Sequence, residues 1–161
     1  MKPSTHFTKI FLIAAAALPS TAAGQGFTRG LDLQAGSKLE VVNRTGRVSV
    51  GTPNASGIDA ASGSSISATS DSPFSADDVR IDASGGHVRI EVLQTVSRRR
   101  IDLAIVAPER TRLNIETHDG EVRIDGNFES AEVATETGTV AASVPTADVR
   151  YDFLWTASRP R

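Results

Sequence analysis

The stretch RLNIETHDGEVRI, residues 112–124, decides the fold class of this chain. Apolar residues alternate with polar ones on both sides of Gly120, which is typical of two half-buried β-strands separated by a bend. Val122 and Ile124, for example, fall on one face of the second strand. Glycine suits such a bend, because a turn that ends in the left-handed conformation is free of strain only without a Cβ.

The same pattern recurs in three other places, Val41–Val50, Ile81–Ile90 and Val133–Ala142. The turn glycines of the four copies are Gly46, Gly86, Gly120 and Gly138, at successive intervals of 40, 34 and 18 along the chain. These intervals are close to two, two and one copies of a unit of roughly 17–20 residues, a length typical of stacked repeats. They predict an all-β protein built as a β-solenoid, a stack of short strands that bury one another's apolar faces. The alternative is an antiparallel β-sandwich of hairpins, in which each glycine closes a turn.

The N-terminus, residues 1–23, has the pattern of a secretory signal peptide. Lys2 and Lys9 precede an apolar run at 10–18, and the small residues at 21–23 suit cleavage by a signal peptidase. This apolar run is too short to cross a bilayer, which needs about 20 residues. We therefore expect cleavage after Ala23, with Gly24 as the alternative last residue of the leader. We also expect export to the periplasm, cell surface or exterior, and contact with the membrane only through the uncleaved leader.

The rest of the chain divides into three parts. A lead-in at 24–37 precedes a repetitive β domain at 38–148, which contains an irregular insertion at 52–76 rich in Ser, Ala, Gly and Pro. Residues 149–161 form an aromatic C-terminal strand or tail, in which alternation places Tyr151, Phe153 and Trp155 on one side. These three aromatics either cap the last layer or dock a partner. The sequence at 158–161 has no cap signal, which is compatible with truncation of a longer protein.

The sequence contains few groups that could support chemistry. It has no cysteine, and after the leader its acidic residues outnumber its basic ones, which does not suit nucleic acid. His87 and His118 are too few for a zinc site, and Ser84 lacks the G-x-S-x-G setting of a hydrolase nucleophile. We expect no catalytic residues, no metal, no cofactor and no enzyme activity.

The segment 112–124 resembles the hallmark of the bacterial putative-adhesin domain family, whose members show a stretch similar to L-x-I-x-T-x-x-G-x-V-x-I. A second copy follows at 131–140, and Ile101–Pro108 is similar to the strand and proline that lead into the hallmark. The resemblance covers about residues 38–145. It implies a right-handed β-helix-like fold in exported or envelope-associated proteins and implies no catalytic residues; the name adhesin is an analogy.

Together these features predict an exported, non-enzymatic, adhesin-like module that binds an envelope component, either protein or polysaccharide. Two alternatives stay open. One is a scaffold that self-associates through the ends of the solenoid. The other is an N-terminal accessory domain of a larger exported protein.

Overall fold

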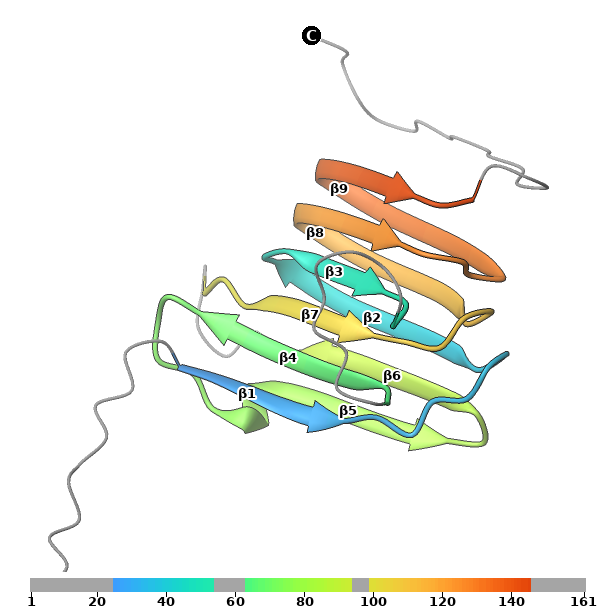
Figure 1. The fold of residues 1–161 in the computed structure, drawn as a ribbon. Helices are drawn as coiled ribbons and strands as arrows, with labels where there is room; N and C mark the ends of the chain where they lie inside the picture. The colour runs from blue at the N-terminus through green and yellow to red at the C-terminus, as the bar shows by residue number, and fades with distance from the viewer. Residues whose placement is uncertain (1–24, 54–62, 94–98, 146–161) are drawn as a thin grey trace, which may run out of the picture.

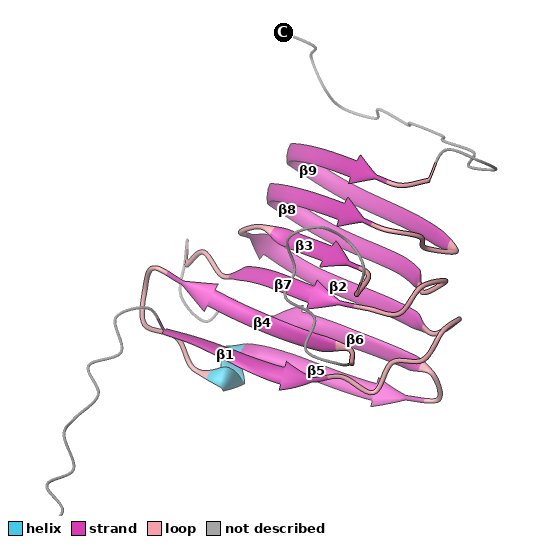
Figure 2. Ribbon diagram, viewed as in Figure 1, coloured by secondary structure: helices cyan, strands magenta, loops and turns pink. Residues whose placement is uncertain are grey.

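The structure, a computed structural model, describes residues 25–53, 63–93 and 99–145, and these residues form an all-β fold (Figures 1 and 2). The strands are β1 (Gln25–Gly30), β2 (Lys38–Thr45), β3 (Val48–Gly51), β4 (Ser65–Ser70), β5 (Val79–Ser84), β6 (His87–Val92), β7 (Asp102–Val106), β8 (Arg112–Asp125) and β9 (Ser130–Ser143). A short 3-10 turn, η1 (Ala76–Asp78), precedes β5. The all-β prediction is confirmed. The predicted signal peptide and the aromatic tail lie outside the described residues.

The strands belong to one mixed sheet that curls back on itself. Its order is β1-β4-β7-β3-β8-β2-β6-β5, and β9 pairs with β8. In Figure 1, β1, β4, β7 and β3 make the front wall, and β2, β6 and β5 lie behind them. The long strand β8 belongs to both walls, because its first half pairs with β2 and its second half with β3.

Three layers stack in parallel at one end of the sheet. The segment 38–51 pairs in register with β8, and β8 pairs with β9 at a constant offset, from Arg112 beside Ser130 to Asp125 beside Ser143. At the other end, β1 with β4, β4 with β7, and β5 with β6 are antiparallel. The sheet thus combines parallel layers, as in the predicted stack, with antiparallel hairpins, as in the predicted sandwich.

The core lies between the two walls and is built from the alternate residues of each strand. Inward residues at equivalent places in successive layers form columns, such as Val41, Ile115 and Val133 or Val48, Val122 and Val140. Within each column the residues of the two inner layers are buried, whereas those of β9 are not. Burial of such side chains is the main stabilising term of the fold.

The pairing corrects how the glycine spacings were interpreted. The two long intervals on either side of Gly86 do not separate stacked copies, because Gly85 and Gly86 close the antiparallel hairpin between β5 and β6. Residue 119, next to Gly120, aligns directly with Thr45 of the first layer. Only the short interval, from Gly120 to Gly138, corresponds to adjacent layers.

Two segments without a clear pattern contain regular strands. The lead-in at 24–37 includes β1, and the insertion at 52–76 includes β4, which lies between β1 and β7. In β4 only Ile66 and Ala68 are buried, and the remaining residues are Ser and Thr. This alternation is hard to recognise in sequence because the apolar residues are few and one of them is small.

Candidate functional site at the open end of the stack

Three of the predicted turn glycines form a column at the bend of the stacked layers. A Cβ on Gly120 would collide with the carbonyl oxygen of Gly46, and a Cβ on Gly138 would collide with the carbonyl oxygen of Gly120. Gly46 faces the carbonyl of Ile101 in the same way and has a φ of 126°. Gly120 and Gly138 do not have the positive φ that the turn prediction implied. They are needed because the backbone of one layer crosses directly over that of the next.

Gly86, the fourth predicted turn glycine, has a different role. It lies beside Gly85 in the β5–β6 hairpin, and the two residues have φ values of 76° and 55°. Nothing lies within 4 Å of a Cβ built on either residue. Here the left-handed conformation of a tight hairpin turn requires glycine, as the sequence predicted.

A polar column stands next to the bend inside the stack. Asn43 is fully buried, and its Nδ2 donates to the carbonyl of Ile101 at 2.8 Å. Thr117 and Thr135 occupy the same place in the next two layers. The bond from Asn43 ties the first stacked layer to the chain that enters β7 and gives that carbonyl a buried partner.

In the part of the chain that the structure describes, β9 is the last layer of the stack. Among the described ranges 25–53, 63–93 and 99–145, β8 is the only strand that pairs with β9, so the other edge of its 14 residues has no strand beside it. Val140 is 47% exposed, whereas Val48 and Val122 in the same column are fully buried. Val133 and Thr135 are half-buried. The end of the core and a long strand edge are therefore accessible together.

The surface around this edge is acidic. The strand β9 contains Glu132 and Glu136 and has no Lys or Arg, and Glu129 precedes it directly. His118 Nδ1 lies 3.0 Å from Glu136 at the bend. A shallow hollow of about 310 Å³ opens where the layers start, lined by Lys38, Arg112, Leu113, Asn114, Ser130, Ala131 and Glu132.

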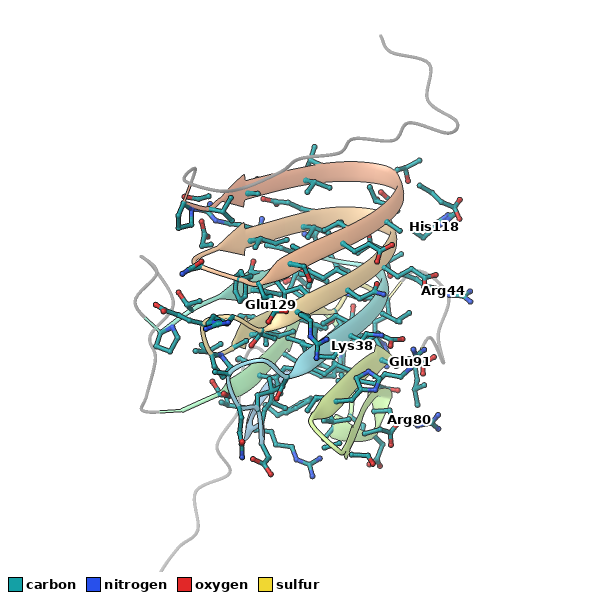
Figure 3. The ribbon with its side chains drawn as sticks, turned by 90° about the vertical axis from the view of Figure 1, so that its right-hand side faces the viewer. Lys38, Arg44, Arg80, Glu91, His118 and Glu129 are labelled. Atoms are coloured by element: carbon teal, nitrogen blue, oxygen red, sulfur yellow. The ribbon has the colours of Figure 1, made fainter. Side chains whose placement is uncertain are left out.

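The histidines do not meet. His87 pairs with Lys38 across β6 and β2, and its Nε2 lies 3.3 Å from Glu40. His118 lies at the bend, well apart from Lys38 in Figure 3. In the part of the chain that the structure describes, no three His, Cys, Asp or Glu residues are grouped as metal ligands.

Arg99 and Arg100, two consecutive basic residues before β7, form ion pairs within the fold. Arg99 Nη1 lies 2.7 Å from Asp78, and Arg100 Nε lies 2.9 Å from Asp102. The hydrogen bond and charge of Asp102 raise the pKa of Arg100, and those of Asp125 raise the pKa of Arg123. Neither effect creates a reactive group, since arginine is already charged at every physiological pH.

Tyr151, Phe153 and Trp155, the predicted docking residues, lie outside the described residues. Sequence reasoning did not single out β9 or Val140 as a surface. The sequence signal for this surface is the smaller side chains of the last copy of the repeat, where Ala131 and Ala142 replace Leu113 and Ile124. Among the described helical residues, none belongs to a helix long and apolar enough to span a membrane.

No protein-family model matches the sequence, and no curated protein matches it either. Solved structures similar to this chain include a putative cell adhesion protein from Clostridium sporogenes, with 11% identity and a TM-score of 0.48, over 71% of this chain and 58% of that one. Another is a putative adhesin from Parabacteroides merdae, with 8% identity and a TM-score of 0.43, over 77% of this chain and 59% of that one. A putative lipid binding protein from Parabacteroides distasonis is similar with 10% identity and a TM-score of 0.36, over 74% and 59%. This chain spans less than two thirds of each of these proteins. Several of its structural neighbours are described as putative adhesion proteins or adhesins, a description shared with the family that the repeat resembles.

Proposed function

We propose that the chain is an exported, non-enzymatic binding module that recognises an envelope component through the open edge of β9. One observation carries this proposal: within the described ranges, the 14-residue strand has an unpaired edge and an accessible core residue, Val140, along the same line. An unpaired strand edge is a row of backbone donors and acceptors ready to pair with another chain. The parallel layers beneath β9 are stacked as in a solenoid, and they hold that edge on a rigid support.

The chemistry of the edge favours an extended polypeptide as the bound segment. Main-chain hydrogen bonds supply affinity in strand addition, and alternate side chains supply specificity. Apolar side chains of the added strand cover Val133 and Val140, and a basic side chain suits Glu132 or Glu136. Of the two expected partner classes, this supports an envelope protein over a polysaccharide.

The charge of β9 also argues against a scaffold that joins two copies through their β9 edges. If two copies paired through their β9 edges, Glu132 and Glu136 of both copies would come together with no basic residue on either strand. Like charges placed opposite each other destabilise a sheet. The accessory-domain alternative is compatible with the proposal, because the same edge serves whether or not the chain is part of a longer protein.

The proposal is tested by placing a charge on the face of β9 that a bound strand would cover. Val140→Lys puts an ammonium group where a bound strand would bury it, and Ala141→Lys puts the same charge one residue further along, on the opposite face of β9. Binding of the purified chain to envelope fractions from its own cells is measured by co-sedimentation, before and after the fractions are treated with protease.

We expect binding to protease-sensitive material, at least about tenfold weaker for Val140→Lys and nearly unchanged for Ala141→Lys, since burying an unpaired charge costs well over about 1.4 kcal/mol. Binding that survives protease treatment would identify a polysaccharide instead. Equal affinities of the two variants would exclude the β9 edge as the binding site.

A further inference from the structure

At the bend of the stack, a carbonyl oxygen of each layer lies where the next layer has no side chain. The carbonyl of Gly46 fills the space that a Cβ on Gly120 would need, and the carbonyl of Gly120 fills the space above it, at Gly138. Figure 1 shows these layers one above another, with β9 uppermost. Each bend residue is therefore glycine because of the layer beneath it.

Gly138 presents the same obstacle to a strand that binds the edge of β9. The pairing of β9 with β8 keeps one register through the bend, with Gly138 beside Gly120 and paired residues on both sides. A strand added to β9 in that register meets the carbonyl of Gly138 as Gly138 meets the carbonyl of Gly120. The residue that it places over Gly138 must then be glycine, because a Cβ would collide with that oxygen.

The direction of the added strand follows from the layers below it. The segment 38–51, β8 and β9 run parallel and bend at the same place. An antiparallel strand has a different pattern of hydrogen bonds and would not continue the column of carbonyls at the bend. A parallel strand continues both the ladder and the column.

We propose that the partner's segment runs parallel to β9 along its whole length and carries a glycine over Gly138, with large apolar residues on either side at the spacing of the chain's own repeat. Counted from that glycine, the residues seven and five places before it lie over Ala131 and Val133, and those two and four places after it lie over Val140 and Ala142. This inference rests on the proposed function and names the kind of polypeptide that the β9 edge accepts.

The side chains of β9 leave room for such residues. Ala131 replaces Leu113 and Ala142 replaces Ile124, so the inward positions of β9 are smaller than those of β8 beneath them. Large apolar side chains above these alanines fill the end of the core, as close packing requires. Val140, which is 47% exposed, is covered in the same register.

Charge selects one further position of the partner. Its residue six places before the glycine lies over Glu132. A basic residue is favoured there, as in the parallel ladder of β2 and β6, where Arg89 stands beside Glu40 and forms an ion pair with it. Glu136 is already next to His118, whose Nδ1 lies at 3.0 Å, so a basic residue gains more over Glu132.

The chain itself supplies the sequence of a probe. A synthetic peptide with the sequence Arg112–Asp125 has the required pattern, because β8 lies on the first stacked layer in the same way. Over β9 it would place Gly120 over Gly138 and Asn114 over Glu132. Binding of the labelled peptide to the purified chain is measured by fluorescence anisotropy.

The decisive peptide variant is Gly120→Ala, and Glu116→Ala is its control, since Glu116 lies on the outward face, away from the bend. We expect Gly120→Ala to bind at least about tenfold more weakly, because the added methyl overpacks the bend, and Glu116→Ala to bind within about twofold of the parent. Alanine restricts the unbound peptide more than glycine does, which favours binding, so weaker binding reports the collision alone.

The charge is tested with Asn114→Lys in the peptide. We expect it to bind about two- to fivefold more tightly at low salt, and to lose that advantage on the chain variant Glu132→Gln. The chain variant Val140→Lys should bind the parent peptide at least about tenfold more weakly. Equal binding by that variant would place the peptide elsewhere and overturn the proposal.

Equal affinities of the parent and Gly120→Ala peptides, or no binding of the parent up to about 1 mM, would also overturn it. Tighter binding of a peptide with the same residues in reverse order would show an antiparallel partner. A dimer of the chain that the parent peptide dissociates would make the occupant a second copy. Envelope binding that Val140→Lys weakens, but for which the parent peptide does not compete, would reject this inference and keep the proposed function.

Discussion

At the scale of single residues, the chain uses one sequence pattern for two physical purposes. Gly86 is needed for its left-handed conformation, with open space around it. Gly120 and Gly138 are needed because a neighbouring backbone occupies the place of a Cβ. Both settings select glycine, so the sequence pattern is the same although the structural causes differ.

Gly120→Ala tests the second cause. The added methyl collides with the carbonyl oxygen of Gly46, so the layers must separate at the bend. We expect the free energy of unfolding to fall by about 1–3 kcal/mol, the usual cost of overpacking. Gly30→Ala is the control, since nothing lies within 4 Å of its Cβ and its φ is not positive. It should change stability by less than about 1 kcal/mol in urea titrations. Equal effects of the two variants would contradict this explanation.

At the scale of elements, the layers differ in how much each can bury. Ile115 of β8 is fully buried between layers on both sides, whereas Val133 of β9, in the same column, is half-buried. The stabilisation from an apolar side chain follows the area that it removes from water. Equivalent positions of the repeat therefore contribute unequally.

Truncation of these two residues measures the difference. Ile115→Ala should lower the free energy of unfolding by about 2–5 kcal/mol, because it leaves a cavity in a closed core. Val133→Ala should cost less than about 1 kcal/mol, because it loses fewer methyl groups and part of its surface is already exposed. Urea titrations of both variants check this, and a cost for Val133→Ala equal to that of Ile115→Ala would show that β9 is covered as completely as β8.

At the scale of the whole molecule, the two ends of the curled sheet are unlike. One end finishes in the short antiparallel strands β1 and β5, and the other in the long parallel strand β9. Short edge strands give little template for further pairing. This asymmetry is the reason that the proposed binding site lies at the β9 end.

Amide hydrogen exchange should show this gradient. Amides of β8 at 112–117 and 122–125, where this strand is paired on both sides, should be the most protected, and those at 139–143 of β9 should exchange fastest within the stacked layers. Protection at 139–143 equal to that of β8 would mean that this half of the edge is already covered in the free chain.

The all-β class and the repeat that relates the last two layers could be predicted from the sequence, because residues in one parallel ladder share a local alternation and a bend glycine. The strand β4 could not, because its Ser- and Thr-rich sequence has only two buried positions. The hairpin at Gly86 could not be distinguished from a stacked bend. The candidate site was missed because exposure of Val140 depends on what lies beside its strand.

By itself, therefore, the sequence determined which segments form most of the strands, which of their faces point inward, and where the backbone needs glycine, since these follow from local alternation and sterics. Only the tertiary structure decided which strands are neighbours, whether a neighbour is parallel or antiparallel, and which layer ends the stack. Those properties depend on contacts between residues far apart in the chain, such as Lys38 with both His87 and Arg112. The free edge of β9 is a property of that arrangement, although its residues follow the same repeat as those of β8.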